Sequence, residues 1–157
     1  MKIRSVKSNA RMNEFSVITY SGAEYSIPYS KAEPKATSDN RIREVWVDRE
    51  LGKEAFTFVL ESGAEGSVHI EQILEYNEDP TYLANLLTYK LSLEAQKCIE
   101  SSDLSRRQMA KRLKTSVPQL YRLLDPSNTS KSMSQLVALL HILDCDVDVV
   151  VKKKSAA

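Results

Sequence analysis

The sequence predicts an α+β protein in two parts: a duplicated, mostly antiparallel β domain over residues 1–78 and an all-α domain over residues 79–157 that ends in a β-strand. In the first part apolar and polar residues alternate, which is typical of strands with one buried face. In the second part apolar residues recur at helical spacing as far as Ile142. The charge also changes sign, with 10 Lys and Arg against 13 Asp and Glu in the first part and 12 against 8 in the second.

The first part matches itself at an offset of about 41 residues. Ser21-Gly-Ala-Glu24 falls on Ser62-Gly-Ala-Glu65, and Val6 falls on Val47. Each copy is therefore expected to hold three short strands, with its glycine in a tight turn that requires a positive φ. Residues 30–41 show no periodic apolar pattern and predict a solvated linker between the copies. We expect the two copies to form a small sandwich or barrel around Phe15, Val17, Trp46, Phe56 and Phe58.

Helix signals begin at Asp79-Pro80, where a capping side chain precedes a proline at the first helical position. Residues 79–101 predict either one helix or two helices divided at Ser92, and the pattern leaves both open. A later helix is expected to start within Ser130–Ser134, and the alternation from Asp144 to Lys152 predicts the C-terminal strand. The inward residues expected for that later helix are Met133, Leu136, Val137 and Leu140.

Two short amphipathic helices are predicted between Leu104 and Leu124. Ser105 and Ser116 are the expected N-caps, and a turn of about three residues starting at Lys114 joins the helices. So tight a turn makes the helices cross steeply, which needs a small residue at the crossing, and Ala110 is that residue. The residues expected to face inward are Met109, Ala110, Leu113, Leu120, Leu123 and Leu124.

This segment, LSRRQMAKRLKTSVPQLYRLL, resembles the run LTQxELAxxLGVSQPTVSRLL of the lambda-repressor-like helix-turn-helix family, which includes phage repressors, Cro-like proteins and many antitoxins. The resemblance covers residues 92–145 and implies a five-helix DNA-binding domain whose recognition helix is residues 116–122. The chain departs from the family at Lys114, where a glycine in the left-handed conformation is usual, and at Val117, which replaces a common glutamine.

Two sets of DNA-contacting residues follow. Gln and Arg are able to make paired hydrogen bonds to adenine and guanine edges in the major groove. By the resemblance, the base-contacting residues are Val117, Gln119, Tyr121 and Arg122. Residues 104–131 hold seven Lys and Arg against one acid, which suits a phosphate-facing surface. The expected phosphate contacts are Arg106, Arg107, Lys111, Lys114, Lys131 and Ser132.

These residues predict a sequence-specific transcriptional regulator of prokaryotic type that binds double-stranded DNA as a homodimer and acts as a repressor. The alternative is an antitoxin or other interaction module that neutralises a toxin or another protein and represses its own operon. The stripe Leu83, Leu86, Leu87 and the strand face Val147, Val149, Val151 are candidate dimer surfaces, or both pack onto the β domain. Whether the N-terminal domain dimerises, senses a ligand or binds a partner stays open.

Other functions find little support in the sequence. His69 and His141 have no second ligand at metal spacing, and the four glycines form no phosphate loop, so we expect no enzyme, no metal and no cofactor. No apolar run is long enough to span a bilayer, which predicts a cytoplasmic protein without membrane contact. Cys98 and Cys145 lie in apolar stretches and are expected to be reduced core residues, with a disulfide or redox switch as the alternative.

Overall fold

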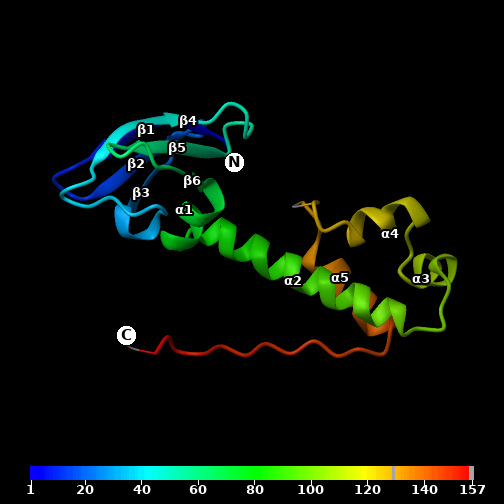
Figure 1. The fold of residues 1–157 in the computed structure, drawn as a ribbon. Helices are drawn as coiled ribbons and strands as arrows, with labels where there is room; N and C mark the ends of the chain where they lie inside the picture. Colours follow the sequence, from blue (N-terminus) through cyan, green and yellow to red (C-terminus); the bar gives the residue numbers. More distant parts are fainter. Residues whose placement is uncertain (129, 156–157) are drawn as a thin grey trace. The chain divides into compact units, whose positions relative to one another are not determined.

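The computed structural model describes residues 1–128 and 130–155, and it divides into two compact units (Figure 1). Unit 1 comprises residues 1–83 and unit 2 begins at Ala84. Among the described residues, unit 1 holds the six strands, a short 3-10 helix and one short α-helix, whereas the regular structure of unit 2 is helical. An N-terminal β part followed by helices is therefore the observed order of an α+β chain.

Unit 1 contains two three-stranded antiparallel sheets of the same topology. In both sheets the pairing register shifts near the start of the first strand, between Ile3 and Ser5 and between Ile42 and Glu44. Gly22 and Gly63, in the turns between the second and third strands, both have φ +87°. The two copies found in the sequence thus correspond to two sheets with one design. The strands are β1 (Ile3–Asn9), β2 (Glu14–Thr19) and β3 (Glu24–Pro28), then β4 (Ile42–Val47), β5 (Ala55–Leu60) and β6 (Glu65–His69).

The first strands align differently from the prediction. In the first copy Val6 pairs with Val17. In the second copy Phe58 occupies the position of Val17, and it pairs with Val45. Val45 and not Val47 is therefore the counterpart of Val6. The cause is the connection between β4 and β5, which is longer than that between β1 and β2. The sequence offset between the two copies is therefore smaller in their first strands than in their second strands.

The core of unit 1 is aromatic and lies between the two copies. The Phe15 ring is 4.8 Å from Phe56 and 5.2 Å from Phe58, measured between ring centroids, and all three side chains are fully buried. Tilted ring pairs at such distances are favourable beyond their burial alone. Trp46 was expected in this core but is 40% exposed, because its neighbours Val45 and Val47 point to the core side of β4 and Trp46 points away.

The connection over residues 30–41 is mostly exposed, as expected for a linker, but part of it packs against unit 1. It starts with a short 3-10 helix, Tyr29–Lys31, and Ala32 is buried. The chain then crosses β6 at Gly66, where an added Cβ would lie 2.7 Å from Pro34 Cδ and would also collide with the Glu33 carbonyl oxygen. Gly66 replaces the tyrosine found at the equivalent position of the first copy, Tyr25, and so makes room for this crossing.

Two helices follow the sheets, α1 (Ile70–Tyr76) and α2 (Pro80–Glu100). Asp79 caps α2 as predicted: its Oδ1 accepts a hydrogen bond from the Tyr82 backbone N–H at 2.9 Å, and its Oδ2 accepts one from the Tyr25 hydroxyl at 2.9 Å. α2 is one continuous helix, so Ser92 does not begin a second one. Tyr82 packs against the core of unit 1, whereas Ala95 and Ile99 belong to the core of unit 2.

Unit 2 adds three short helices to α2, namely α3 (Arg106–Arg112), α4 (Val117–Leu124) and α5 (Met133–Ile142). In α5, Leu136 and Leu140 are buried as predicted, but Met133 and Val137 are 47% and 39% exposed and Leu139 is buried instead. Among the described residues, no helix combines the length and apolar character needed to cross a membrane. The buried core of unit 2 consists of Ala95, Ile99, Met109, Ala110, Leu120, Leu123, Leu124, Leu136, Leu139, Leu140 and Leu143.

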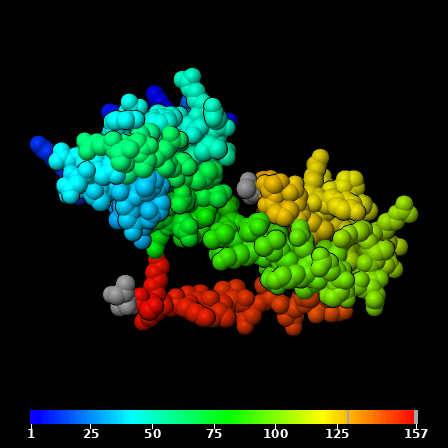
Figure 2. Space-filling model, in the orientation of Figure 1, coloured from blue at the N-terminus to red at the C-terminus, as the bar shows by residue number. Residues whose placement is uncertain are grey.

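The predicted fold of the second part is wrong in its architecture. A five-helix repressor domain closed by a strand is not what the described residues form, since α2 runs through as a single long helix and residues 145–155 have no regular structure. Figures 1 and 2 show this C-terminal segment (red) as an extended run. A strand needs a neighbouring edge to satisfy its N–H and C=O groups, and the described remainder of unit 2 is helix and loop. Val149, Val150 and Val151 accordingly remain 79%, 74% and 90% exposed.

Candidate nucleic-acid interface

The pair of short helices α3 and α4 forms as predicted, because the sequence supplies a cap for each. Ser105 Oγ accepts from the Gln108 N–H at 3.2 Å, and the Gln108 side chain accepts from the Ser105 N–H at 2.8 Å, which is a complete capping box. Ser116 Oγ accepts from the Gln119 N–H at 3.3 Å. Both helices therefore start at the residues that the sequence predicts.

The turn between the helices has the left-handed residue that the family pattern requires, but it is a lysine. Lys114 has φ +55°. Its N–H donates to the Lys111 carbonyl at 3.1 Å, and the next N–H, of Thr115, donates to the Ala110 carbonyl at 2.9 Å. These two bonds are a Schellman motif, which satisfies the last carbonyls of α3. The tight reversal is thus kept, at the cost of left-handed strain at Lys114.

The inward faces of α3 and α4 are buried as predicted. Met109 and Leu120 are 1% and 0% exposed, and Ala110 is 3% exposed in the same core. Only a side chain as small as alanine leaves helices free to approach closely, so Ala110 suits the expected crossing. α3 contacts both α4 and α5.

The C-terminal end of α4 is held by three side chains that the sequence did not indicate. Gln96 Nε2 donates to the Leu124 carbonyl at 2.8 Å, and Asn128 Nδ2 donates to the Arg122 carbonyl at 3.1 Å. Lys131 Nζ donates to the Asp125 carbonyl at 2.5 Å. The last carbonyls of a helix have no partner within the helix, so these donors fix where α4 ends and how it sits on α2.

Lys131, one of the expected phosphate contacts, is directed inward. Its Nζ also donates to the buried Ser92 Oγ at 2.9 Å, and Ser92 in turn donates to the Thr88 carbonyl at 2.8 Å. Burial lowers the pKa of Lys131, and the nearby Asp125 carboxylate partly offsets that shift. The ammonium therefore links α2 to the end of α4 through these hydrogen bonds.

The base-contacting residues expected on α4 do not share one face. At about 100° per residue the buried Leu120, Leu123 and Leu124 define an inner face, and Arg122 and Pro118 lie on the opposite side of the helix. Gln119 is exposed next to Arg122. Val117 is half-buried against the core of unit 2, so its expected contact with a base is not supported by its placement.

Tyr121 and Arg106 line a hollow of about 360 Å³ between α2, α3 and the end of α4. Tyr121 is 56% exposed, while one terminal nitrogen of Arg106, NH1, is buried without a hydrogen-bond partner in the described structure. Glu100 lines the same hollow. Arg106 is therefore partly drawn into this hollow, whereas Tyr121 lines it but remains exposed on α4.

The other expected phosphate contacts lie on α3 and its turn. Arg107, Lys111 and Lys114 are exposed, and within the described part of the chain none of them pairs with a carboxylate. Ser132 is the N-cap of α5, with its Oγ 3.4 Å from the Gln135 N–H and 2.7 Å from Ser134 Oγ. We use the name reading surface for five of the exposed residues among the expected contacts: Arg107, Lys111, Lys114, Gln119 and Arg122.

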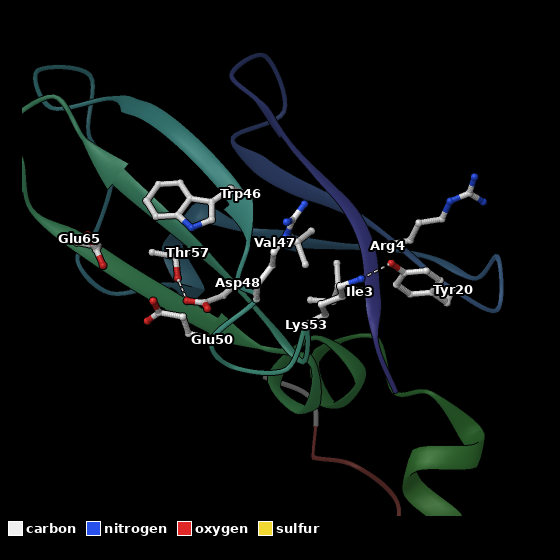
Figure 3. Close-up of a pocket in the computed structure, with 11 residues that line it drawn as sticks. Ile3, Arg4, Tyr20, Trp46, Val47, Asp48, Glu50, Lys53, Thr57 and Glu65 are labelled. Carbon is white, nitrogen blue, oxygen red and sulfur yellow. Dashed lines mark hydrogen bonds between the residues drawn. The ribbon is translucent and has the colours of Figure 1, made fainter.

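Unit 1 has a hollow of its own, of about 620 Å³, shown in Figure 3. Lys53 Nζ donates to the Tyr20 hydroxyl at 2.8 Å, and this bond with the charge of Lys53 lowers the pKa of Tyr20. Asp48 is held by the Leu51 N–H and the Thr57 hydroxyl, which lower its pKa. The polar groups of this hollow thus form two separate pairs, Lys53 with Tyr20 and Asp48 with Thr57.

No group of three or more His, Cys, Asp or Glu among the described residues is placed to hold a metal ion. No protein-family model matches the chain, and no curated protein is significantly similar to it.

Proposed function

We propose that this protein is a sequence-specific DNA-binding transcriptional regulator of prokaryotic type, acting in the cytoplasm as a repressor. The observation that carries the proposal is the reading surface: of two capped helices joined by a tight turn, α4 exposes Gln119 and Arg122, and α3 with its turn exposes three cations that form no ion pair within the described residues. A surface of this composition fits the edges of bases flanked by phosphates.

In this proposal α4 enters the major groove, which is wide enough for a helix. Arg122 makes paired hydrogen bonds with a guanine and Gln119 with an adenine. Arg107, Lys111 and Lys114 bind phosphates and set the orientation of α4 without reading sequence. The capping bonds to the Leu124 and Arg122 carbonyls support the proposal, because they hold α4 in place before DNA arrives.

The functional form is proposed to be a homodimer. α4 is only eight residues long, and base contacts by Gln119 and Arg122 specify too few base pairs to pick one site from a genome. Two copies related by a twofold axis place two such helices in successive major grooves about 34 Å apart. Sedimentation analysis with and without DNA measures the stoichiometry, and a strictly monomeric complex contradicts this part of the proposal.

Selection of binding sites from random duplexes with the purified full chain, at two salt concentrations, tests the function. The expected result is a palindromic sequence whose enrichment is lost with Gln119→Ala and Arg122→Ala, each weakening specific binding by roughly 1–3 kcal/mol. Arg43→Ala, on an exposed position of β4, is the matched control and should leave binding unchanged. Wild-type preference in both α4 variants would refute the assignment of α4.

A further inference from the structure

The two cysteines of the chain lie 47 positions apart in sequence, yet their Sγ atoms are 2.7 Å apart. Cys98 is on α2 and Cys145 follows α5, and both are half-buried against the core of unit 2. A disulfide bond is about 2.05 Å long, so only a small movement separates this thiol pair from a covalent link. Both residues belong to unit 2, and the pair is a feature of that unit alone.

The backbone on both sides of the pair is fixed. Cys98 is held inside a continuous helix. Cys145 follows a Schellman motif at the end of α5, in which Asp144 has φ +57°, the Asp144 N–H donates to the His141 carbonyl at 3.1 Å, and the Cys145 N–H donates to the Leu140 carbonyl at 2.9 Å. The thiols therefore meet because two helices present them, and a high effective concentration follows.

We propose that Cys98 and Cys145 are a modification site at which a small-molecule disulfide of the glutathione class closes a reversible intramolecular disulfide. This inference is independent of the proposed DNA binding. The link closes a loop that contains α3, α4 and α5, so oxidation stabilises the fold of unit 2 by restricting its unfolded chain. Disulfides of cytoplasmic proteins are usually transient or redox-sensing, which fits a reversible link.

The exchange is balanced in two steps. The Cys98 thiol loses its proton to solvent and the thiolate attacks one sulfur of the oxidised glutathione, the S–S bond of glutathione breaks, and one glutathione thiolate leaves. Cys145 then loses its proton to solvent and attacks Cys98 Sγ, which expels the second glutathione as a thiolate. Two electrons pass from the protein to glutathione. We expect Cys98 to react first, because the hydrogen bond that Cys145 donates to Cys98, together with burial, raises the pKa of Cys145.

The test equilibrates the full chain with buffers of reduced and oxidised glutathione, native and in urea, and quantifies the thiol state by alkylation and intact mass. A disulfide that stabilises the native state forms more favourably in the folded chain, and by the same free energy. We therefore expect the equilibrium constant for forming this disulfide to be on the order of 100-fold larger in the native chain than in the chain unfolded by urea. The native product should be a monomer that has lost two hydrogen atoms and carries no glutathione.

Cys145→Ser and Cys98→Ser serve as paired controls. Cys145→Ser should accumulate glutathione on Cys98, since the resolving thiol is gone, and oxidation should raise the melting temperature only in the wild-type chain. A native equilibrium constant within threefold of the unfolded one overturns the proposal, as does accumulation of glutathione adducts or disulfide-linked dimers in the wild type. Because the comparison in urea uses the wild-type chain, it decides the matter even if a serine variant does not fold.

Discussion

Lys131→Met separates the structural role of Lys131 from a role in binding phosphate. Methionine keeps the length of the side chain but removes both hydrogen bonds of Nζ, to Ser92 Oγ and to the Asp125 carbonyl. A hydrogen bond to a charged group contributes about 1.5–3 kcal/mol. The cost of burying the ammonium, which lowers the pKa of Lys131, offsets part of that contribution.

We therefore expect Lys131→Met to lower the free energy of unfolding of unit 2 by about 1–2 kcal/mol, measured by urea denaturation. Because Ser92 keeps its bond to Thr88, the hydroxyl is not left without a partner, which keeps the loss in this range. The salt dependence of binding to a labelled duplex should not change, since in this structure the ammonium is occupied within the protein.

Arg107→Met is the matched control, because Arg107 is exposed on α3. It should alter stability by less than about 0.5 kcal/mol but reduce the slope of log affinity against log salt by roughly 1, the contribution of one phosphate contact. If Lys131→Met leaves stability intact and reduces the slope of log affinity against log salt as Arg107→Met does, then Lys131 turns outward to bind DNA. Our assignment of a structural role to Lys131 would then be wrong.

Three further predictions concern stability. Gly66→Ala should destabilise unit 1 by about 1–3 kcal/mol, because the added Cβ meets the backbone of Glu33, and wild-type thermal stability would show that the crossing is loose. Lys114→Gly should stabilise unit 2 by about 0.5–1 kcal/mol. Glycine removes left-handed strain of roughly 1–2 kcal/mol, and this gain exceeds the larger conformational entropy that a glycine loses on folding. A loss of stability in urea denaturation would contradict this prediction. Hydrogen bonds, first from the Tyr82 N–H, hold the pKa of Asp79 below its ordinary value of 3.8, so its contribution is complete above that value and is lost as pH falls through the lowered pKa. Unfolding measured between pH 5 and 2 should therefore be less steeply acid-sensitive in Asp79→Asn, and an identical pH profile would exclude this contribution.

Features that depend on a few neighbouring residues were predictable from the sequence. The starts of α2, α3 and α4 follow from Asp79, Ser105 and Ser116, because each cap bonds a backbone N–H only three residues ahead. The turns at Gly22 and Gly63 follow for the same reason, since a tight hairpin with positive φ is a local demand.

Features that depend on distant partners were decided by the tertiary structure. The alternation after Asp144 is typical of a strand, but a strand pairs only with a second segment. The described residues of unit 2 provide no sheet edge, and none of those after Asp144 forms a strand. In the sequence Lys131 resembles the other cations of a basic segment. The structure shows that its ammonium donates a hydrogen bond to Ser92, 39 positions away. Likewise Val117 and Arg106 are assigned to the outside by their motif and are drawn inward by packing that no short pattern encodes. Local hydrogen bonds thus determine where helices and turns begin in this protein. Tertiary packing of each unit's core decides which cations and which apolar residues face solvent.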